Sequence, residues 1–318
     1  MDKKLLASSS PHIRSRVSTP GIMRDVIIAL LPALAAGLYF FRLQALLVVI
    51  VSVASCVLTE YAFNRMMKKK QTVGDYSAVV TGMLLAFNLP PALPLWMAAI
   101  GGVFAILVVK QLFGGLGHNF MNPALAARAF MLASWPVQMT SWTGPADAVS
   151  SATPLALVKK GGEAAGGVLP SYGSLFSGNV AGCIGETCVI ALLLGAAYLF
   201  YRRVITPAIP LGFIGTVALT TWALGGDRPF SGDFLYQILS GGLILGAFFM
   251  ATDYTTSPVT AAGRLAMGIG CGLITSVIRL YGGYPEGVSY SILLMNVAAP
   301  LIERYTLPRS FGGEKAHV

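Results

Sequence analysis

The residues best placed to do chemistry lie in a polar, glycine-rich segment, residues 136–183, between two strongly apolar regions of the chain. In this segment the carboxylate of Asp147 shortly precedes the hydroxyl of Thr153. The small residues that leave room beside the hydroxyl are Ser150, Ser151 and Ala152. A threonine hydroxyl is a weak nucleophile until a neighbouring group positions or activates it, and Asp147 could hold a metal ion or position the segment for a modifying enzyme. The segment therefore indicates either an acceptor hydroxyl that a second enzyme modifies or a solvated turn.

The composition places most of this chain in lipid. Hydrophobic residues make up 55% of the 318 residues and charged residues only 11%, and the mean hydropathy is +0.70. About a quarter of the residues of a soluble domain are charged. Apolar runs recur from Val26 to Met295, which predicts a single integral membrane domain over residues 1–318. The formal charge of +9 lies in short clusters between these runs, so it indicates membrane topology and not nucleic-acid binding.

The elements that must position the polar segment are helices, because a bilayer core of about 30 Å needs about 20 residues of helix. By this measure about ten segments are candidate transmembrane helices. They are Ile22–Phe41, Leu43–Ala62, Ser77–Leu89, Leu93–Leu112, Phe120–Trp135, Ile184–Tyr201, Ala208–Leu224, Phe234–Met250, Ala261–Tyr281 and Val288–Ile302. The third and fifth are too short for a full span, which predicts broken or half-length helices. The predicted fold class is an all-α polytopic membrane protein.

Basic residues predict the orientation of these helices. With an even number of spans both termini lie on one side, together with most of the lysine and arginine clusters. That side should be the cytoplasm, since cytoplasmic loops carry an excess of Lys and Arg. We therefore expect cytoplasmic tails at residues 1–21 and 303–318 and an external loop at residues 136–183 that carries Thr153. No small-residue cleavage site follows the first apolar run, so we expect the first span to remain in the mature protein.

Several short stretches of the first half recur in the same order in the second half. The pairs are Gly82–Ala86 with Gly246–Met250, Lys110–Gly115 with Arg279–Gly283, and Met121–Asn122 with Met295–Asn296. Chance similarity between glycine-rich apolar sequences is the alternative explanation, but the preserved order favours duplication. Two halves of five spans each would be inverted repeats.

A few ionisable residues lie at membrane depth, where such residues are usually functional. Arg128 lies near the middle of a predicted span, where it could face an anionic group or pair with a neighbour such as Glu60. Lys110 and Arg279 lie nearer the span ends, where we expect their side chains to reach the interface. The four cysteines match no metal or iron-sulfur spacing, so we expect no metal site.

The residues Asp147–Thr153 resemble the flavinylation motif of a family formed by the D subunit of the Rnf electron transport complex and the B subunit of the sodium-pumping NADH:quinone reductase. Further stretches resemble the same family at the same relative places: Gly114–Ala124, Ala251–Pro258, Arg279–Gly287 and Asn296–Arg304. Together they cover most of the membrane part. The Rnf subunit is the more similar, because the reductase subunit carries a longer amino-terminal extension.

This resemblance implies two flavins. FMN would be attached to Thr153 through a phosphoester, with Asp147, Ser150, Ser151 and Ala152 completing the motif, and Arg128 could face the flavin phosphate. A non-covalent riboflavin would lie within the spans toward the cytoplasmic side. The polar residues at helix breaks that could hold it are Asn88, Asn119, Asn122, Asp253, Thr255 and Thr256. For each of them, helix capping or interhelical hydrogen bonding is the alternative.

The resemblance also implies a function: an electron-transfer subunit of an ion-translocating ferredoxin:NAD⁺ oxidoreductase in the cell membrane, coupling electron transport to Na⁺ or H⁺ movement and catalysing no net reaction alone. Its partners would be the flavinylated G subunit, the membrane A and E subunits, the soluble iron-sulfur and flavin B and C subunits, and a flavin transferase. The alternatives are a secondary transporter or channel, or the quinone-reducing B subunit of the sodium-pumping reductase. A transporter would have no use for a flavin acceptor at Thr153.

Overall fold

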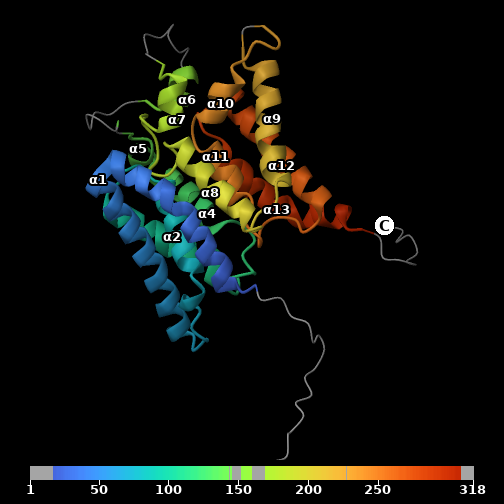
Figure 1. Ribbon diagram of the computed structural model, residues 1–318. Helices are drawn as coiled ribbons and strands as arrows, with labels where there is room; N and C mark the ends of the chain where they lie inside the picture. The colour runs from blue at the N-terminus through green and yellow to red at the C-terminus, as the bar shows by residue number, and fades with distance from the viewer. Residues whose placement is uncertain (1–16, 143, 145–151, 160–168, 227, 309–318) are drawn as a thin grey trace, which may run out of the picture.

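The computed structural model describes residues 17–142, 144, 152–159, 169–226 and 228–308 (Figure 1). Within these ranges the regular structure is helical throughout. The all-α prediction is therefore confirmed. The number of membrane crossings, the inverted order of the two halves and the boundaries of the tails and the external loop stay predictions.

The longest helix, α1 (Thr19–Met66), contains the first two predicted spans. It is interrupted at Arg42, whose φ of 52° and ψ of −134° are not helical. The interruption folds α1 into a V, with both arms pointing to the same side of the molecule (Figure 1). A non-glycine residue at positive φ is uncommon, so the turn at Arg42 is a defined break between two helices.

Most of the other predicted spans also correspond to helices. In the first half these are α2 (Ser77–Phe87), α3 (Leu95–Phe104) and α4 (Pro123–Ser134), with a short turn η1 (Val73–Asp75) before α2 and a π-helix η2 (Ala105–Gln111) after α3. In the second half they are α8 (Val189–Tyr201), α9 (Ala208–Leu224), α12 (Ala261–Tyr281) and α13 (Val288–Thr306). The short helices between the halves are α5 (Pro136–Met139), α6 (Pro154–Lys159) and α7 (Tyr172–Ser177).

One predicted span is wrong as a continuous helix. Residues 234–250 form α10 (Phe234–Leu239), a break, α11 (Leu243–Leu245) and the π-helix η4 (Gly246–Met250). The break falls at Ser240 and Gly241, and Gly241 has a φ of 69° that glycine adopts without strain. Hydropathy alone does not reveal such a break, because it is the same whether the backbone continues or turns; the signal lies in the residue types Ser240–Gly241–Gly242.

Close approaches between helices depend on glycine. A Cβ on Gly195 of α8 would lie 2.0 Å from the carbonyl oxygen of Ala29, and a Cβ on Gly82 of α2 would lie 2.6 Å from Val53 Cα. Both partners belong to α1. Small residues at such crossings let helix backbones pack tightly, which is typical of helix association in lipid.

The loop before α8 enters the core and closes the end of α2. Ile184 N–H donates to Leu89 O at 3.2 Å, and Gly185 N–H donates to Phe87 O at 3.1 Å. Ile184 and Phe87 are fully buried. This loop therefore supplies the hydrogen-bond partners that the last carbonyls of the short helix α2 lack.

The surface of the helices is apolar. Two helices, α1 and α12, are long and hydrophobic enough to cross a bilayer, and five shorter ones are also apolar. Leu58 of α1 and Val277 of α12 are more than half exposed. Such exposed side chains suit a lipid environment.

Candidate functional site

The largest described cavity has a volume of about 360 Å³ and brings Thr153 together with Arg128. It lies among α4, α5, α6 and the loop between α12 and α13. Aromatic rings that line it come from Trp142, Tyr284 and Tyr290. Cavities that bind cofactors have about this volume and are mostly apolar, with a few polar groups.

Thr153 stands at the start of α6, and its side chain is half-buried. Its Oγ1 accepts a hydrogen bond from Ala156 N–H at 3.3 Å, as a residue capping a helix does. Ala152 is half-buried and lines the same cavity. Asp147, Ser150 and Ser151 lie outside the described residues. The described part of the motif therefore places Thr153 at the cavity wall, and its role as an acceptor stays a prediction.

Lys159 anchors the other end of α6. Its Nζ donates to the carbonyl oxygens of Tyr284 at 2.8 Å and Ile278 at 3.1 Å. Burial lowers the pKa of the Lys159 ammonium. This contact holds α6, and with it Thr153, over the loop that carries Tyr284.

Arg128 of α4 is buried at the floor of the cavity. It forms an ion pair with Glu286 and donates to Ser289 Oγ at 2.6 Å and to Asn88 Oδ1 at 3.3 Å. The alternative in which Arg128 pairs with Glu60 is therefore wrong. Glu286 lies in the α12–α13 loop, which the fold brings onto α4.

Glu60 pairs instead with Lys110, whose Nζ lies 2.8 Å from Glu60 Oε2 and 2.5 Å from Ser77 Oγ. Lys110 is 2% exposed and Arg279 is 4% exposed. The expectation that these two side chains reach the interface is therefore wrong. Each finds its partners inside: Arg279 donates to the carbonyl oxygens of Gln237 and Ser240.

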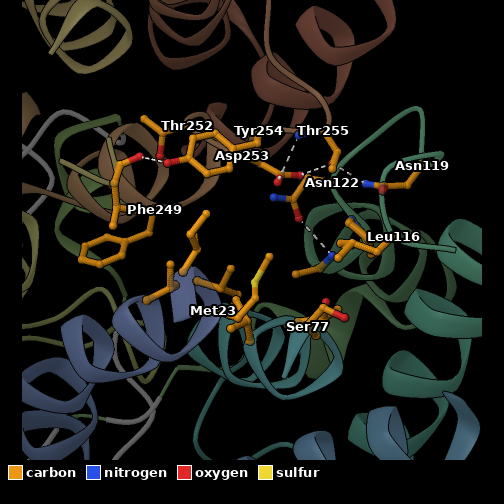
Figure 2. A pocket seen from close by; sticks show the side chains of 18 of the residues that line it. Met23, Ser77, Leu116, Asn119, Asn122, Phe249, Thr252, Asp253, Tyr254 and Thr255 are labelled. Carbon is orange, nitrogen blue, oxygen red and sulfur yellow. Dashed lines mark hydrogen bonds between the residues drawn. The ribbon is translucent and has the colours of Figure 1, made fainter. Parts of the chain in front are cut away.

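A second pocket lies at the opposite end of α4 (Figure 2). Its polar edge consists of Asn119, Asn122, Asp253 and Thr255, and its apolar wall includes Met23 and Phe249. Asn119 Nδ2 donates to Thr255 Oγ1 at 3.0 Å, and Thr255 Oγ1 donates to Asp253 Oδ2 at 2.9 Å. The buried Oδ1 of Asn119 has no hydrogen-bond partner. An unpaired buried acceptor beside an apolar wall suits a ligand with a hydrogen-bond donor.

Only some of the six residues considered for the non-covalent flavin line this pocket. Asn119, Asn122, Asp253 and Thr255 line the second pocket, whereas Asn88 and Thr256 do not. Asn122 also has a structural role, because its Oδ1 caps α4 by accepting from Ala124 N–H at 3.0 Å. Thr256 Oγ1 donates to Asp253 Oδ2 at 3.3 Å and so supports the pocket from behind.

Asn88 belongs to a chain of polar contacts through the middle of the protein. Its Oδ1 accepts from Arg128, and its Nδ2 donates to Met250 Sδ at 3.5 Å. Asn122 Nδ2 donates to Met250 O at 3.4 Å, and Asn122 N–H donates to Asn296 Oδ1 at 3.2 Å. Asn122 and Asn296 are positions that the internal repeat pairs, so the two halves meet in this contact.

Glu186 and Glu286 were not selected from the sequence, although both lie beneath Thr153. The chain contains only 13 acidic residues, so every one in or next to an apolar run was a candidate. Glu186 follows Gly182–Gly185, a stretch that shows no helical or strand period. The prediction placed it near the start of the span Ile184–Tyr201, whereas the structure has residues 184–188 as a loop before α8.

Apolar helices that enclose buried ion pairs and two polar-edged cavities define an integral membrane protein. The chain belongs to the NQR2, RnfD, RnfE family, whose pattern matches residues 6–312. It is 56% identical over 315 residues to the D subunit of the Na⁺-translocating ferredoxin:NAD⁺ oxidoreductase complex of Acetobacterium woodii, a match that covers 98% of this chain and 96% of that protein.

Other relatives carry similar names. The D subunit of the proton-translocating ferredoxin:NAD⁺ oxidoreductase complex of Clostridium ljungdahlii is 46% identical over 315 residues, with 96% of this chain and 95% of that protein covered. The D subunit of the ion-translocating oxidoreductase complex of Alcanivorax borkumensis is 39% identical over 339 residues, with 98% of each chain covered.

Proposed function

We propose that this chain is the D subunit of an ion-translocating ferredoxin:NAD⁺ oxidoreductase complex and that it carries FMN on Thr153. The observation that carries the proposal is the cavity of about 360 Å³ that opens beside Thr153 Oγ1 and has Arg128 at its floor. Full-length similarity to the D subunits of complexes that move Na⁺ or H⁺ supports the assignment. It favours this complex over the quinone-reducing relative and over an unrelated secondary transporter.

The residues present fit a flavin phosphoester. Thr153 Oγ1 would hold the phosphate at the cavity wall, and the Arg128 guanidinium supplies positive charge nearby. Trp142, Tyr284 and Tyr290 offer flat apolar surface to a ring system. When bound, a flavin exchanges electrons singly or in pairs, and the protein orients it and sets its surroundings.

The second pocket is the proposed site of a non-covalent riboflavin. Asn119 Oδ1 offers an unpaired acceptor, and Asp253 with Thr255 forms a polar edge against an apolar wall. The free volume there is about 90 Å³, which is less than cofactor pockets usually have. Binding therefore requires side chains of the apolar wall, such as Met23, to move.

In the complex, electrons would pass between the flavinylated G subunit on the outer side and iron-sulfur or flavin carriers on the inner side. The membrane A and E subunits and the soluble B and C subunits would complete the assembly, and a flavin transferase would load Thr153. The proposed location is the cell membrane, with the Thr153 cavity facing outward and both termini in the cytoplasm.

The first experiment is ultraviolet fluorescence of the protein band in a denaturing gel after co-expression with a flavin transferase. We expect the native chain to fluoresce and Thr153→Val to be dark, because valine has no hydroxyl to form the ester. Thr140→Val is the matched control, since Thr140 lines the same cavity, and it should fluoresce. A dark native band, with the transferase active on a known substrate, would contradict the flavin assignment. Solute transport would then be the better-supported function.

The second flavin is tested by extraction with acid, which releases only flavin that is not covalently bound. Asp253→Leu should lose extractable riboflavin, because it removes the polar edge that Thr255 and Thr256 support. Thr252→Val should keep it, since the Thr252 hydroxyl is already bonded to Phe248 O at 2.7 Å. Equal flavin in both variants would contradict this site.

A further inference from the structure

A small cavity lies beneath Thr153, next to the larger one, with which it shares Thr153 and Glu286. It has a volume of about 30 Å³, and its polar boundary includes Thr153, Glu186, Thr187, Ser240 and Glu286. A space of this size with several polar groups at its wall can hold a bound water molecule. The cavity therefore lies between the half-buried Thr153 and two carboxylates, the buried Glu186 and the partly buried Glu286.

Three side chains around this cavity have a buried polar atom without a hydrogen-bond partner: Glu186 Oε2, Thr187 Oγ1 and Ser240 Oγ. The three residues are 7%, 2% and 1% exposed. Buried polar groups are nearly always hydrogen-bonded. Three unpaired atoms around one small cavity therefore point to a ligand.

The two carboxylates face each other across Gly242. A Cβ on Gly242 would lie 2.8 Å from Glu286 Oε1 and 3.1 Å from Glu186 Oε2. Glu286 has partners on both oxygens, Gly242 N–H at 2.6 Å and the Arg128 guanidinium. Glu186 has one partner, Cys183 N–H, which donates to Oε1 at 2.9 Å. Glu186 Oε2 thus faces a second carboxylate and accepts no hydrogen bond from the described residues.

The charged groups around the pair are two arginines from two different helices. Arg128 of α4 is engaged with Glu286, and Arg279 of α12 is held by the carbonyl oxygens of Gln237 and Ser240. Two carboxylates this close repel each other when both are ionised, which favours a proton on the one that has no ion pair of its own. Glu286 is the ionised member because of its pairing with Arg128, which leaves Glu186 as the proton acceptor.

A proton fits this site better than a metal cation. Na⁺ needs several oxygen ligands, and two guanidinium groups nearby would repel it. A protonated carboxyl needs only one acceptor, and the carboxylate of Glu286 or a water in the cavity provides it.

We propose that Glu186 and Glu286 form a proton-binding pair, in which the proton resides on Glu186 and exchanges with external water through the cavity beneath Thr153. Its role rests on the proposed function. A proton taken from external water adds one positive charge to Glu186, which offsets the charge of one electron delivered beside Thr153 by a reduced flavin or iron-sulfur carrier. The existence of the proton site does not depend on a flavin.

The test is infrared spectroscopy of the full chain in lipid, prepared without flavin transferase so that Thr153 is unmodified. We expect the carbonyl band of a protonated carboxyl that shifts in D₂O and disappears as the pH is raised. Glu186→Gln should lose this band. Glu303→Gln, which changes a glutamate of α13 outside both cavities, should keep it. A titrating band that survives in Glu186→Gln, or no such band in the native chain, would overturn the proposal.

Two further measurements distinguish a proton site from a cation site and provide a test if Glu186→Gln does not fold. Replacing choline by Na⁺ at constant pH should leave the band unchanged, and its loss would favour a cation site instead. If Glu186→Gln does not fold, Glu186→Asp retains a carboxyl at a shifted position, so the pH midpoint of the band should move. An unchanged midpoint in Glu186→Asp would contradict the assignment. Because the protein carries no flavin, these results are independent of the gel test of Thr153.

Discussion

Lys110 and Glu60 are 2% and 0% exposed, and within the described residues their ion pair is more deeply buried than the other two. Hydrogen bonds satisfy the remaining atoms: Lys110 also donates to Ser77, and Glu60 accepts from Thr72. Removing two charges from water is costly, and a buried pair stabilises a fold only when its geometry and hydrogen bonds are good. Replacing either residue alone would therefore leave the other buried charge without its counter-charge.

Glu60→Gln should destabilise the protein by about 3–5 kcal/mol, because it leaves the Lys110 ammonium buried without its counter-charge. The double variant Glu60→Leu, Lys110→Met should recover most of this loss. Thermal unfolding in a mild detergent measures both. Asp25→Asn is the control, because its partner Arg202 has a side chain that is 51% exposed, and exposed pairs contribute about 1 kcal/mol or less. A loss in Glu60→Gln no larger than in the control would contradict the argument.

At the scale of elements, α1 is the helix on which the first half is assembled. Its first arm crosses α8 at Gly195, and its second arm crosses α2 at Gly82. Because a glycine provides the contact at each crossing, the helix axes can approach until backbone touches backbone. The kink at Arg42 makes this possible, since it lets one helix present two arms to different partners.

Gly195→Ala should destabilise the protein by about 1–3 kcal/mol, the usual cost of overpacking, because the new methyl group would overlap Ala29 O. Gly215→Ala in α9 is the matched control, since nothing lies within 4 Å of its added Cβ. It should be neutral or slightly stabilising, because alanine favours helix over glycine. Equal thermal stability of the two variants would show that the α1–α8 crossing tolerates a methyl group.

At the scale of the whole molecule, the two flavin candidates lie at opposite ends. The Thr153 cavity is near α5 and α6, along the upper side of Figure 1, and the loop after α1 lies at the lower side. The lower side also carries the basic residues Arg65, Lys68, Lys69 and Lys70. The charge distribution therefore agrees with an outward-facing Thr153 cavity.

The orientation can be checked with single cysteines in intact cells and a membrane-impermeant maleimide. Val137→Cys, at a residue that is 75% exposed in α5, should be labelled from outside. Lys70→Cys should be labelled only after lysis, because we expect it in the cytoplasm. Cys188→Ser provides the background, since the other three cysteines are buried. The reverse pattern would invert the topology and place Thr153 inside.

The sequence predicted helices better than their interruptions. The bounds of α9 and α12 agree with the prediction because each apolar run ends at turn residues. The break in residues 234–250 was missed, although Ser240–Gly241–Gly242 was a visible signal. The partner of Arg128 could not be predicted, because Glu286 lies 158 positions away and only the packed fold brings the α12–α13 loop to α4. Thr153 was selected from the sequence because its motif is local, and its role as a flavin acceptor stays a prediction.

The chain of contacts through Arg128, Asn88, Met250 and Asn122 affects whether water and ions can cross the membrane through the protein. In the described part of the protein, the unpaired buried side-chain atoms do not include any of these residues. The polar side chains of this contact chain are bonded to protein, so none of them is left to bind water. An ion-motive complex dissipates its gradient through any continuous wet path. These contacts therefore close one possible path for water through the described part of the protein, and the two cavities with unpaired polar atoms lie on either side of them.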